Sequence, residues 1–189
     1  HWRDYLPQVG NMFRAFRSHK PDAFHPPLDA NGNVSMDRSK MSGPWPSPRS
    51  WTIAAKLRAA GLAANVDRGV LLELLYGCVG HVANEYDEWE THLDLPDPSK
   101  MLSDAVSAVA AGKKVPYKHP NRPDKVIALL GGIASHVMSN RSDKSKYNKE
   151  RWEAALHIFE AASDHEKDVA ISCCRQMFRT EGGEAGMPP

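Results

Sequence analysis

The segment Ser47-Pro48-Arg49 places a cation where a helix is expected to begin, and such a position can bind an anion. Ser47 is a preferred N-cap residue, and Pro48 suits the first helical position because its missing N–H would have no helical partner there. Arg49 then opposes the helix dipole by about 0.3–1 kcal/mol. An anion in front of the helix, where free backbone N–H groups also point, offsets that cost. The residues alone leave open a solvated arginine on a capped helix.

The other reactive residue types do not form a recognisable site. A phosphate-binding loop needs Gly-x-x-x-x-Gly-Lys-Ser/Thr, and the nearest approach, Gly112-Lys113-Lys114, has no hydroxyl. The nine histidines include no His-Glu-x-x-His, and Glu85, Glu88 and His92 share a helical face that needs ligands from other helices to hold a metal. The sequence contains no Gly-x-Ser-x-Gly elbow, the motif that would indicate a serine nucleophile. We therefore predict no catalytic and no metal-binding residue in this chain alone.

The apolar periodicity predicts an all-α fold of about eight helices and no convincing strand. Asp67 and Asp97 are expected to cap two of the helices, and Gly61 to stop the one that begins after Ser47. Five of the predicted helices cover about 48–60, 81–93, 123–139, 148–162 and 164–179. The other three are indicated by an apolar face between Tyr5 and Phe16, by apolar residues from Leu71 to Val79 after Asp67, and by apolar residues from Met101 to Val109 after Asp97.

Within the helix expected at 48–60, Trp51 lies about 200° around the axis from Arg49. If Arg49 faces an anion, Trp51 should therefore face the core. The residues of this helix available to the core are Trp51, Ala54, Ala55 and Leu57.

Two segments are expected to lack regular structure. Residues 21–47 are rich in proline and contain Asn31-Gly32, which predicts a long loop. The tail 181–189 is predicted to be disordered. The chain of 189 residues has a net charge of +1 and three cysteines without framework spacing, so we expect a reduced, cytoplasmic protein. It contains no apolar run long enough for a membrane span.

Charge is segregated along the chain. Residues 85–97 carry six carboxylates and no Lys or Arg, whereas 113–125 and 141–151 are basic. Such blocks serve as solvated faces, or as acid-to-base contacts between subunits of a ring. Binding of nucleic acid would need the two basic stretches to converge with exposed aromatics such as Tyr117 and Tyr147.

Three stretches of the sequence carry a resemblance to a known family. The pattern Gly-x-x-x-Ser-Pro-Arg-Ser-x-x-x-x-x-x-Leu-x-x-Ala over residues 43–60 resembles the sensor-2 segment of MoxR-like AAA+ ATPases. The variant with a tryptophan soon after the arginine, here Trp51, resembles a bacterial branch of predicted ATPases. The run Leu93-Asp94-Leu95-Pro96-Asp97-Pro98 and the opening Phe13-Arg14-Ala15-Phe16-Arg17-Ser18-His19-Lys20-Pro21 also resemble that branch. The resemblance covers about residues 1–110.

The resemblance implies that residues 1–180 are the helical lid and helical extension of an AAA+ ATPase. Arg49 would sense the terminal phosphates of ATP, held with Mg by a nucleotide-binding core that this chain lacks. The start at His1 without methionine also suggests a fragment, so the chain alone is expected to bind no cofactor and to be inactive. The implied partners are its own core, neighbouring ring subunits and a protein client, without membrane contact. The alternatives are a free-standing adaptor module or, less favoured, a nucleic-acid-binding helical domain.

Overall fold

Every regular element of the described chain is a helix. The computed structural model describes residues 1–25, 31, 43–139 and 146–178. Within these ranges lie eight α-helices, two short 3-10 helices and no β-strand, which confirms the predicted all-α class. The chain divides into two compact units, His1–Asp94 and Leu95–Pro189.

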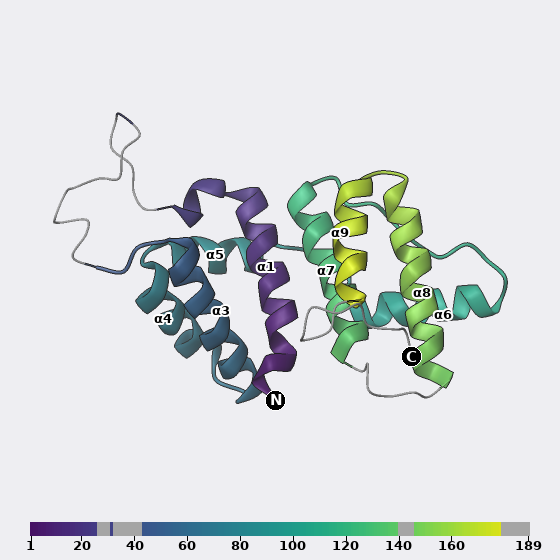
Figure 1. The fold of residues 1–189 in the computed structure, drawn as a ribbon, viewed down its shortest axis with the longest axis horizontal. Helices are drawn as coiled ribbons and strands as arrows, with labels where there is room; N and C mark the ends of the chain where they lie inside the picture. The colour runs from purple at the N-terminus through teal and green to yellow at the C-terminus, as the bar shows by residue number, and fades with distance from the viewer. Residues whose placement is uncertain (26–30, 32–42, 140–145, 179–189) are drawn as a thin grey trace. The chain divides into compact units, whose positions relative to one another are not determined.

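In the first unit, helix α3 (Pro48–Ala63) packs against both α1 (Leu6–His19) and α4 (Arg68–Val79) (Figure 1). Helix α5 (Val82–Thr91) packs against α4, and two 3-10 helices, η1 (Trp2–Tyr5) and η2 (Pro21–Phe24), flank α1. The core of this unit is aromatic. Its large buried rings are Phe13, Phe16, Phe24, Trp51, Tyr86 and Trp89.

The described residues of the second unit form four helices, α6 (Pro98–Ala110), α7 (Pro123–Ser139), α8 (Lys146–Ser163) and α9 (Lys167–Met177). Helix α7 packs against α9, and α8 packs against both α6 and α9. The core is mainly aliphatic, in contrast to that of the first unit. The positions predicted to pack on α7 are all buried: Val126, Leu129, Leu130, Ile133 and Val137.

The predicted aspartate caps are confirmed. Asp67 Oδ1 accepts a hydrogen bond of 2.7 Å from the Gly69 N–H at the start of α4. Asp97 Oδ1 accepts one of 2.9 Å from the Ser99 N–H at the start of α6. These side chains satisfy first-turn amides that have no partner within the helix, so each helix begins where its cap stands.

The prediction that Gly61 ends its helix is wrong, because α3 continues to Ala63. A Cβ on Gly61 would lie 2.2 Å from Leu71 Cδ2, so this glycine permits the close packing of α3 on α4. The left-handed position that ends the helix belongs to Asn65, whose φ is 52°. The Val66 N–H then donates to the Gly61 carbonyl over 2.9 Å, which closes the helix end.

The prediction that Leu57 faces the core is also wrong, since 38% of its surface is exposed. Trp51, Ala54 and Ala59 define the buried face of α3. Leu57 lies about 240° around the helix from Trp51 and therefore points away from that face.

The predicted loop at 21–47 contains an ordered anchor at its start. Residues 21–24 form η2, and Ala23 and Phe24 are buried. Phe24 stacks on Trp51 with 4.5 Å between ring centroids, so the loop is tied to α3 by an aromatic contact. Residues 26–30 and 32–42 of this loop, and the tail predicted at 181–189, lie outside the described residues.

Candidate functional site at the start of helix α3

The first turn of α3 is closed by a reciprocal capping arrangement. The Ser50 N–H donates to Ser47 Oγ over 3.1 Å, and the Ser47 N–H donates to Ser50 Oγ over 2.8 Å. Pro48 occupies the first helical position and has no N–H. The Trp51 N–H donates to the Ser47 carbonyl. Among the described residues, the Arg49 N–H is therefore the first-turn donor that is left over.

The Arg49 side chain lies exposed beside that N–H. It forms no hydrogen bond or ion pair with another described residue. The guanidinium contributes a full positive charge at the end of the helix where the dipole is also positive. The start of α3 thus offers a backbone donor, an arginine fork and the helix dipole to an anion.

Trp51 fixes the rotation of α3, with only 3% of its surface exposed. Its ring contacts Phe13 of α1 edge-on at 4.7 Å between centroids and stacks on Phe24 of η2. The indole N–H donates to the Ala23 carbonyl over 2.8 Å. The prediction that Trp51 and Arg49 occupy opposite faces is confirmed, and the buried tryptophan keeps the arginine outward.

The chain enters α3 along a path that depends on Gly80. This residue has φ +67°, and a Cβ there would lie 2.4 Å from the Pro44 carbonyl oxygen. The segment before Ser47 therefore runs directly against the corner between α4 and α5. Pro46 in the same segment is buried, which holds the N-cap residue in place.

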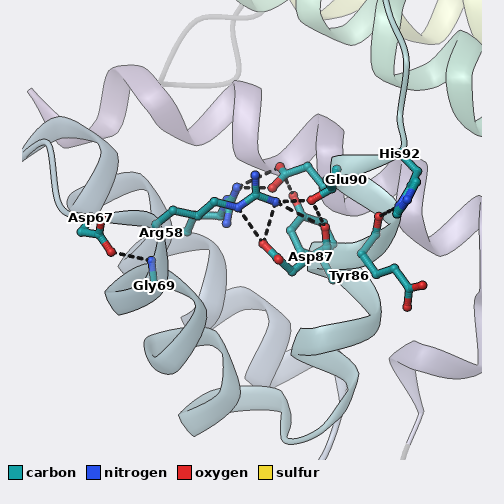
Figure 2. A network of polar contacts seen from close by, with 10 residues as sticks. Arg58, Asp67, Gly69, Tyr86, Asp87, Glu90 and His92 are labelled. Atoms are coloured by element: carbon teal, nitrogen blue, oxygen red, sulfur yellow. Dashed lines mark hydrogen bonds and ion pairs between the residues drawn. The ribbon is translucent and has the colours of Figure 1, made fainter.

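A polar network joins α5 to α3 (Figure 2). Arg58 of α3 forms an ion pair with Glu90 at 2.6 Å, and both side chains are largely buried. The Tyr86 hydroxyl donates to Glu90 Oε1 over 2.8 Å, and the Arg58 guanidinium lies 5.3 Å from the centre of the Tyr86 ring. Burial raises the pKa of Tyr86 well above its usual value, with a further contribution from Glu90. The tyrosine therefore acts as a neutral donor that orients the carboxylate.

Two exposed ion pairs hold the outer side of α5. Arg68 of α4 contacts Asp87 at 2.8 Å and donates to Thr91 Oγ1 over 2.5 Å. Lys20 contacts Glu85 at 2.5 Å. Three carboxylates of the acidic stretch at 85–97 thus have cationic partners inside the first unit. The stretch is less available for contacts between subunits than its charge alone indicated.

The described residues hold no group of three His, Cys, Asp or Glu side chains that could bind a metal ion. His92, which shares a sequence face with Glu85 and Glu88, instead places Nδ1 2.7 Å from the Glu88 carbonyl oxygen (Figure 2). Glu85 is turned to Lys20. Glu85 and His92 therefore have separate local partners, and the Glu88 side chain is exposed.

The two basic stretches differ from the arrangement that binding of nucleic acid would need. In 113–125, Arg122 pairs with Asp124, and Tyr117 is half-buried with its hydroxyl 3.1 Å from His119 Nδ1. In 141–151, residues 141–145 and the Tyr147 side chain lie outside the described part of the structure, and Arg151 is buried. The described residues contain no pair of exposed aromatics on converging basic segments.

The comparisons with known proteins add no relative. No family model, curated protein or solved structure matches this chain. Among the described helices, none combines the length and apolar character that crossing a membrane requires.

Proposed function

We propose that this chain is the C-terminal helical part of an AAA+ ATPase and that Arg49 senses bound ATP. The observation that carries the proposal is the pairing of two unused donors at one helix start, the Arg49 N–H and the Arg49 guanidinium. An arginine at this end of a helix opposes the dipole unless an anion is present. The resemblance of residues 43–60 to a sensor-2 segment identifies that anion as the terminal phosphate of ATP.

In this proposal the nucleotide, with its Mg ion, is held by a core domain outside the present chain. Arg49 binds the terminal phosphate through charge-assisted hydrogen bonds, each contributing about 1.5–3 kcal/mol. Trp51, on the opposite face, transmits the position of the arginine to the aromatic core of the first unit. Hydrolysis removes the phosphate contact, and the helical lid then rotates relative to the core and to neighbouring ring subunits. The expected setting is the bacterial cytoplasm, which agrees with three cysteines that form no disulfide.

The proposal is tested with Arg49→Ala in the protein that contains the ATPase core. We expect hydrolysis or ATP-dependent assembly to fall tenfold or more, because about 1.4 kcal/mol corresponds to a factor of ten. Arg49→Lys should restore only part of the loss, since an ammonium does not reproduce the two-pronged contact of a guanidinium. Lys56→Ala, an exposed cation two turns along α3, is the matched control and should leave hydrolysis unchanged.

Thermal unfolding of the same variants separates a functional effect from a structural one. Arg49 is exposed, so its removal should leave the melting temperature of the first unit nearly unchanged. Normal hydrolysis and assembly by Arg49→Ala would refute the sensor role. The isolated chain should show no tight ATP binding in calorimetry, and one-to-one micromolar binding would contradict the need for a separate core.

A free-standing adaptor module is the second candidate, and one observation favours it. Five large apolar side chains are exposed on α3 and α4 of the first unit: Ile53, Leu57, Val70, Leu74 and Tyr76. A contiguous patch of exposed apolar side chains is typical of surfaces that contact another protein, and two pairs of these residues, Ile53 with Leu57 and Val70 with Leu74, are spaced i, i+4 on their helices. If Arg49→Ala is silent while Leu57→Asp and Leu74→Asp abolish association with a partner, the adaptor function is favoured over nucleotide sensing.

A further inference from the structure

A charged cleft in the second unit has no part in the proposed nucleotide sensing. It has a volume of about 540 Å³. One side is formed by the end of α6 and the segment that follows it, and the other by the C-terminal part of α8. This volume is in the range of sites that bind small molecules or a few residues of a peptide. The floor includes Val109 and Val115, and Val115 is buried. An apolar floor under a polar rim is the arrangement found where proteins bind one another.

The two walls of the cleft carry opposite charges. Lys113 and Lys114 line the wall after α6, and Glu160 and Asp164 line the wall formed by α8. All four side chains are exposed. Among the described ion pairs, none joins a lysine of one wall to a carboxylate of the other, and Glu160 instead contacts His157 at 3.2 Å. The cleft therefore presents separated positive and negative edges to solvent.

The basic wall is held by a well-defined turn. Gly112 has φ +64°, its N–H donates to the Val109 carbonyl over 2.9 Å, and the Lys113 N–H donates to the Ala108 carbonyl over 2.9 Å. This pair of bonds is the Schellman arrangement that ends helices at a left-handed glycine. Lys113 and Lys114 are consequently placed by backbone geometry before any ligand arrives.

The segment is fixed a second time beyond the cleft. Tyr117 and His119 follow the basic wall, whereas His165 and Glu166 follow the acidic one. The His119 and His165 rings stack with centroids 4.5 Å apart, and His119 Nε2 lies 3.8 Å from Glu166 Oε1. The segments that follow the two walls are thus joined by side-chain contacts just outside the cleft.

The acidic wall carries charges that are unfavourable for α8 itself. Glu160 lies in the last turn of α8 and Asp164 follows the last helical residue, and no basic residue occupies that turn. Negative charges at this end of a helix oppose its dipole. A cationic group placed between the two carboxylates would offset their unfavourable interaction with the helix dipole. An anion placed between the two lysines would likewise offset the repulsion between their charges.

We propose that this cleft binds a short segment of a partner protein that carries both a basic and an acidic side chain. The basic side chain lies between Glu160 and Asp164, the acidic one contacts Lys113 and Lys114, and the intervening backbone crosses the floor at Val109 and Val115. In this arrangement the acidic wall faces a positive charge and the basic wall faces a negative charge. A purely anionic ligand would offer no cation to Glu160 and Asp164 and would be repelled by both carboxylates.

The test uses capped peptides, acetyl-Gly-Lys-(Ala)n-Glu-Gly-amide with different numbers of alanines, in both charge orders. They are titrated into the isotopically labelled chain, and the amide chemical shifts are followed by NMR. We expect low-millimolar binding by at least one peptide, with shifts concentrated at residues 109–115 and 157–164. Replacing either charged residue of the peptide by glutamine should weaken binding about fivefold, as for one exposed ion pair.

Variants of both walls make the test specific. Lys113→Gln with Lys114→Gln, and separately Glu160→Gln with Asp164→Asn, should each weaken binding of the best peptide about fivefold or more. The controls Lys100→Gln and Glu153→Gln change exposed charges of α6 and α8 away from the cleft and should leave binding unchanged. Without any peptide, the Glu160→Gln and Asp164→Asn pair should raise the melting temperature of the second unit by about 2–4 °C, because it removes charges that oppose the α8 dipole.

Three results would overturn the proposal. The first is the absence of localised shifts with every peptide. The second is equal binding by the dual-charge peptide and by its acidic-only version, which would indicate a simple anion site. The third is a fall in melting temperature for the carboxylate variant, because the lysines would then already neutralise Glu160 and Asp164. None of these results bears on Arg49, which lies in the first unit.

Discussion

Trp51 connects three segments of the first unit that are distant in the sequence. Its ring contacts Phe13 of α1 and Phe24 of η2, and its indole N–H binds the Ala23 carbonyl. A residue that fills a core and also satisfies a buried carbonyl contributes in two separable ways. One contribution is apolar packing and the other is a hydrogen bond whose loss leaves an unpaired acceptor.

Substitutions of Trp51 should separate these two contributions. Trp51→Ala is expected to lower the free energy of unfolding by about 3–5 kcal/mol, enough to unfold much of the first unit. Trp51→Phe keeps an aromatic ring but loses the indole donor and should cost about 1–3 kcal/mol. Urea unfolding measures both, with exposed Ile53→Ala as the control. Equal urea midpoints for Trp51→Ala and the parent would show that α3 is oriented differently.

The raised pKa of Tyr117 predicts that the second unit loses stability at high pH. Burial, with the nearby carboxylate of Glu166, raises the pKa of Tyr117 to about 12. In the unfolded chain a tyrosine ionises near pH 10, as is usual for the free side chain. Between about pH 10 and 12 the unfolded state therefore binds fewer protons than the folded state, and stability falls as the pH rises through this window.

The measurement compares urea midpoints of the second unit at pH 8 and pH 11. The parent should lose more stability between these values than Tyr117→Phe, which cannot ionise. Tyr5→Phe, an exposed tyrosine of the first unit, is the control and should retain the pH dependence of the parent. The same loss in Tyr117→Phe and the parent would assign the high-pH effect to other groups.

At the scale of elements, the packing of α3 on α4 depends on Gly61. Helix α3 carries this glycine where the Leu71 side chain approaches most closely, and Leu71 is itself buried. Helix α4 carries a contrasting glycine, Gly77, around which a Cβ would meet nothing within 4 Å. The two positions allow the steric role of glycine to be distinguished from its general cost in a helix.

Gly61→Ala and Gly77→Ala should therefore change stability in opposite directions. The first forces Leu71 or the helices apart and is expected to destabilise the first unit by about 1–3 kcal/mol. The second removes backbone freedom from the unfolded chain and should stabilise by about 0.4–1 kcal/mol. Thermal or urea unfolding gives both values on one scale. Stabilisation by both substitutions would mean that α3 and α4 do not approach closely at Gly61.

At the scale of the whole molecule, the chain forms two units with cores of different character. The first is centred on aromatic rings, and the second on aliphatic side chains of α6 to α9. A unit that has its own buried core can fold without the rest of the chain. The boundary follows Asp94, shortly after the end of α5 and before the Asp97 cap of α6.

We therefore expect residues 1–94 and 95–189, produced as separate chains, to be helical and to unfold cooperatively. Circular dichroism during thermal unfolding is the measurement, and the second fragment should retain the high-pH behaviour attributed to Tyr117. Trp51→Ala in the intact chain should affect only the transition of the first unit. Two fragments that are both unfolded until they are mixed would contradict the division into separate cores.

Local signals in the sequence were sufficient for the existence of the α-helices and for three of their starts. Capping depends on residues within one turn, so Ser47, Asp67 and Asp97 marked three helix starts correctly. The opposite placement of Arg49 and Trp51 follows from helical geometry alone. The sensor role of Arg49 stays a proposal, because the anion that it requires belongs to no part of the described chain.

Tertiary structure decided the features that depend on residues far apart in the sequence. Gly61 had the sequence signature of a helix stop, but the approach of Leu71 made it an interior packing residue. The acidic stretch is partly neutralised inside the first unit by Lys20, Arg58 and Arg68, which lie far from it in the sequence. The cleft between Lys113 and Glu160 likewise arises only when α6 and α8 pack together. The sequence shows where charged residues and glycines lie along the chain, whereas the packing of the helices determines which residues they contact.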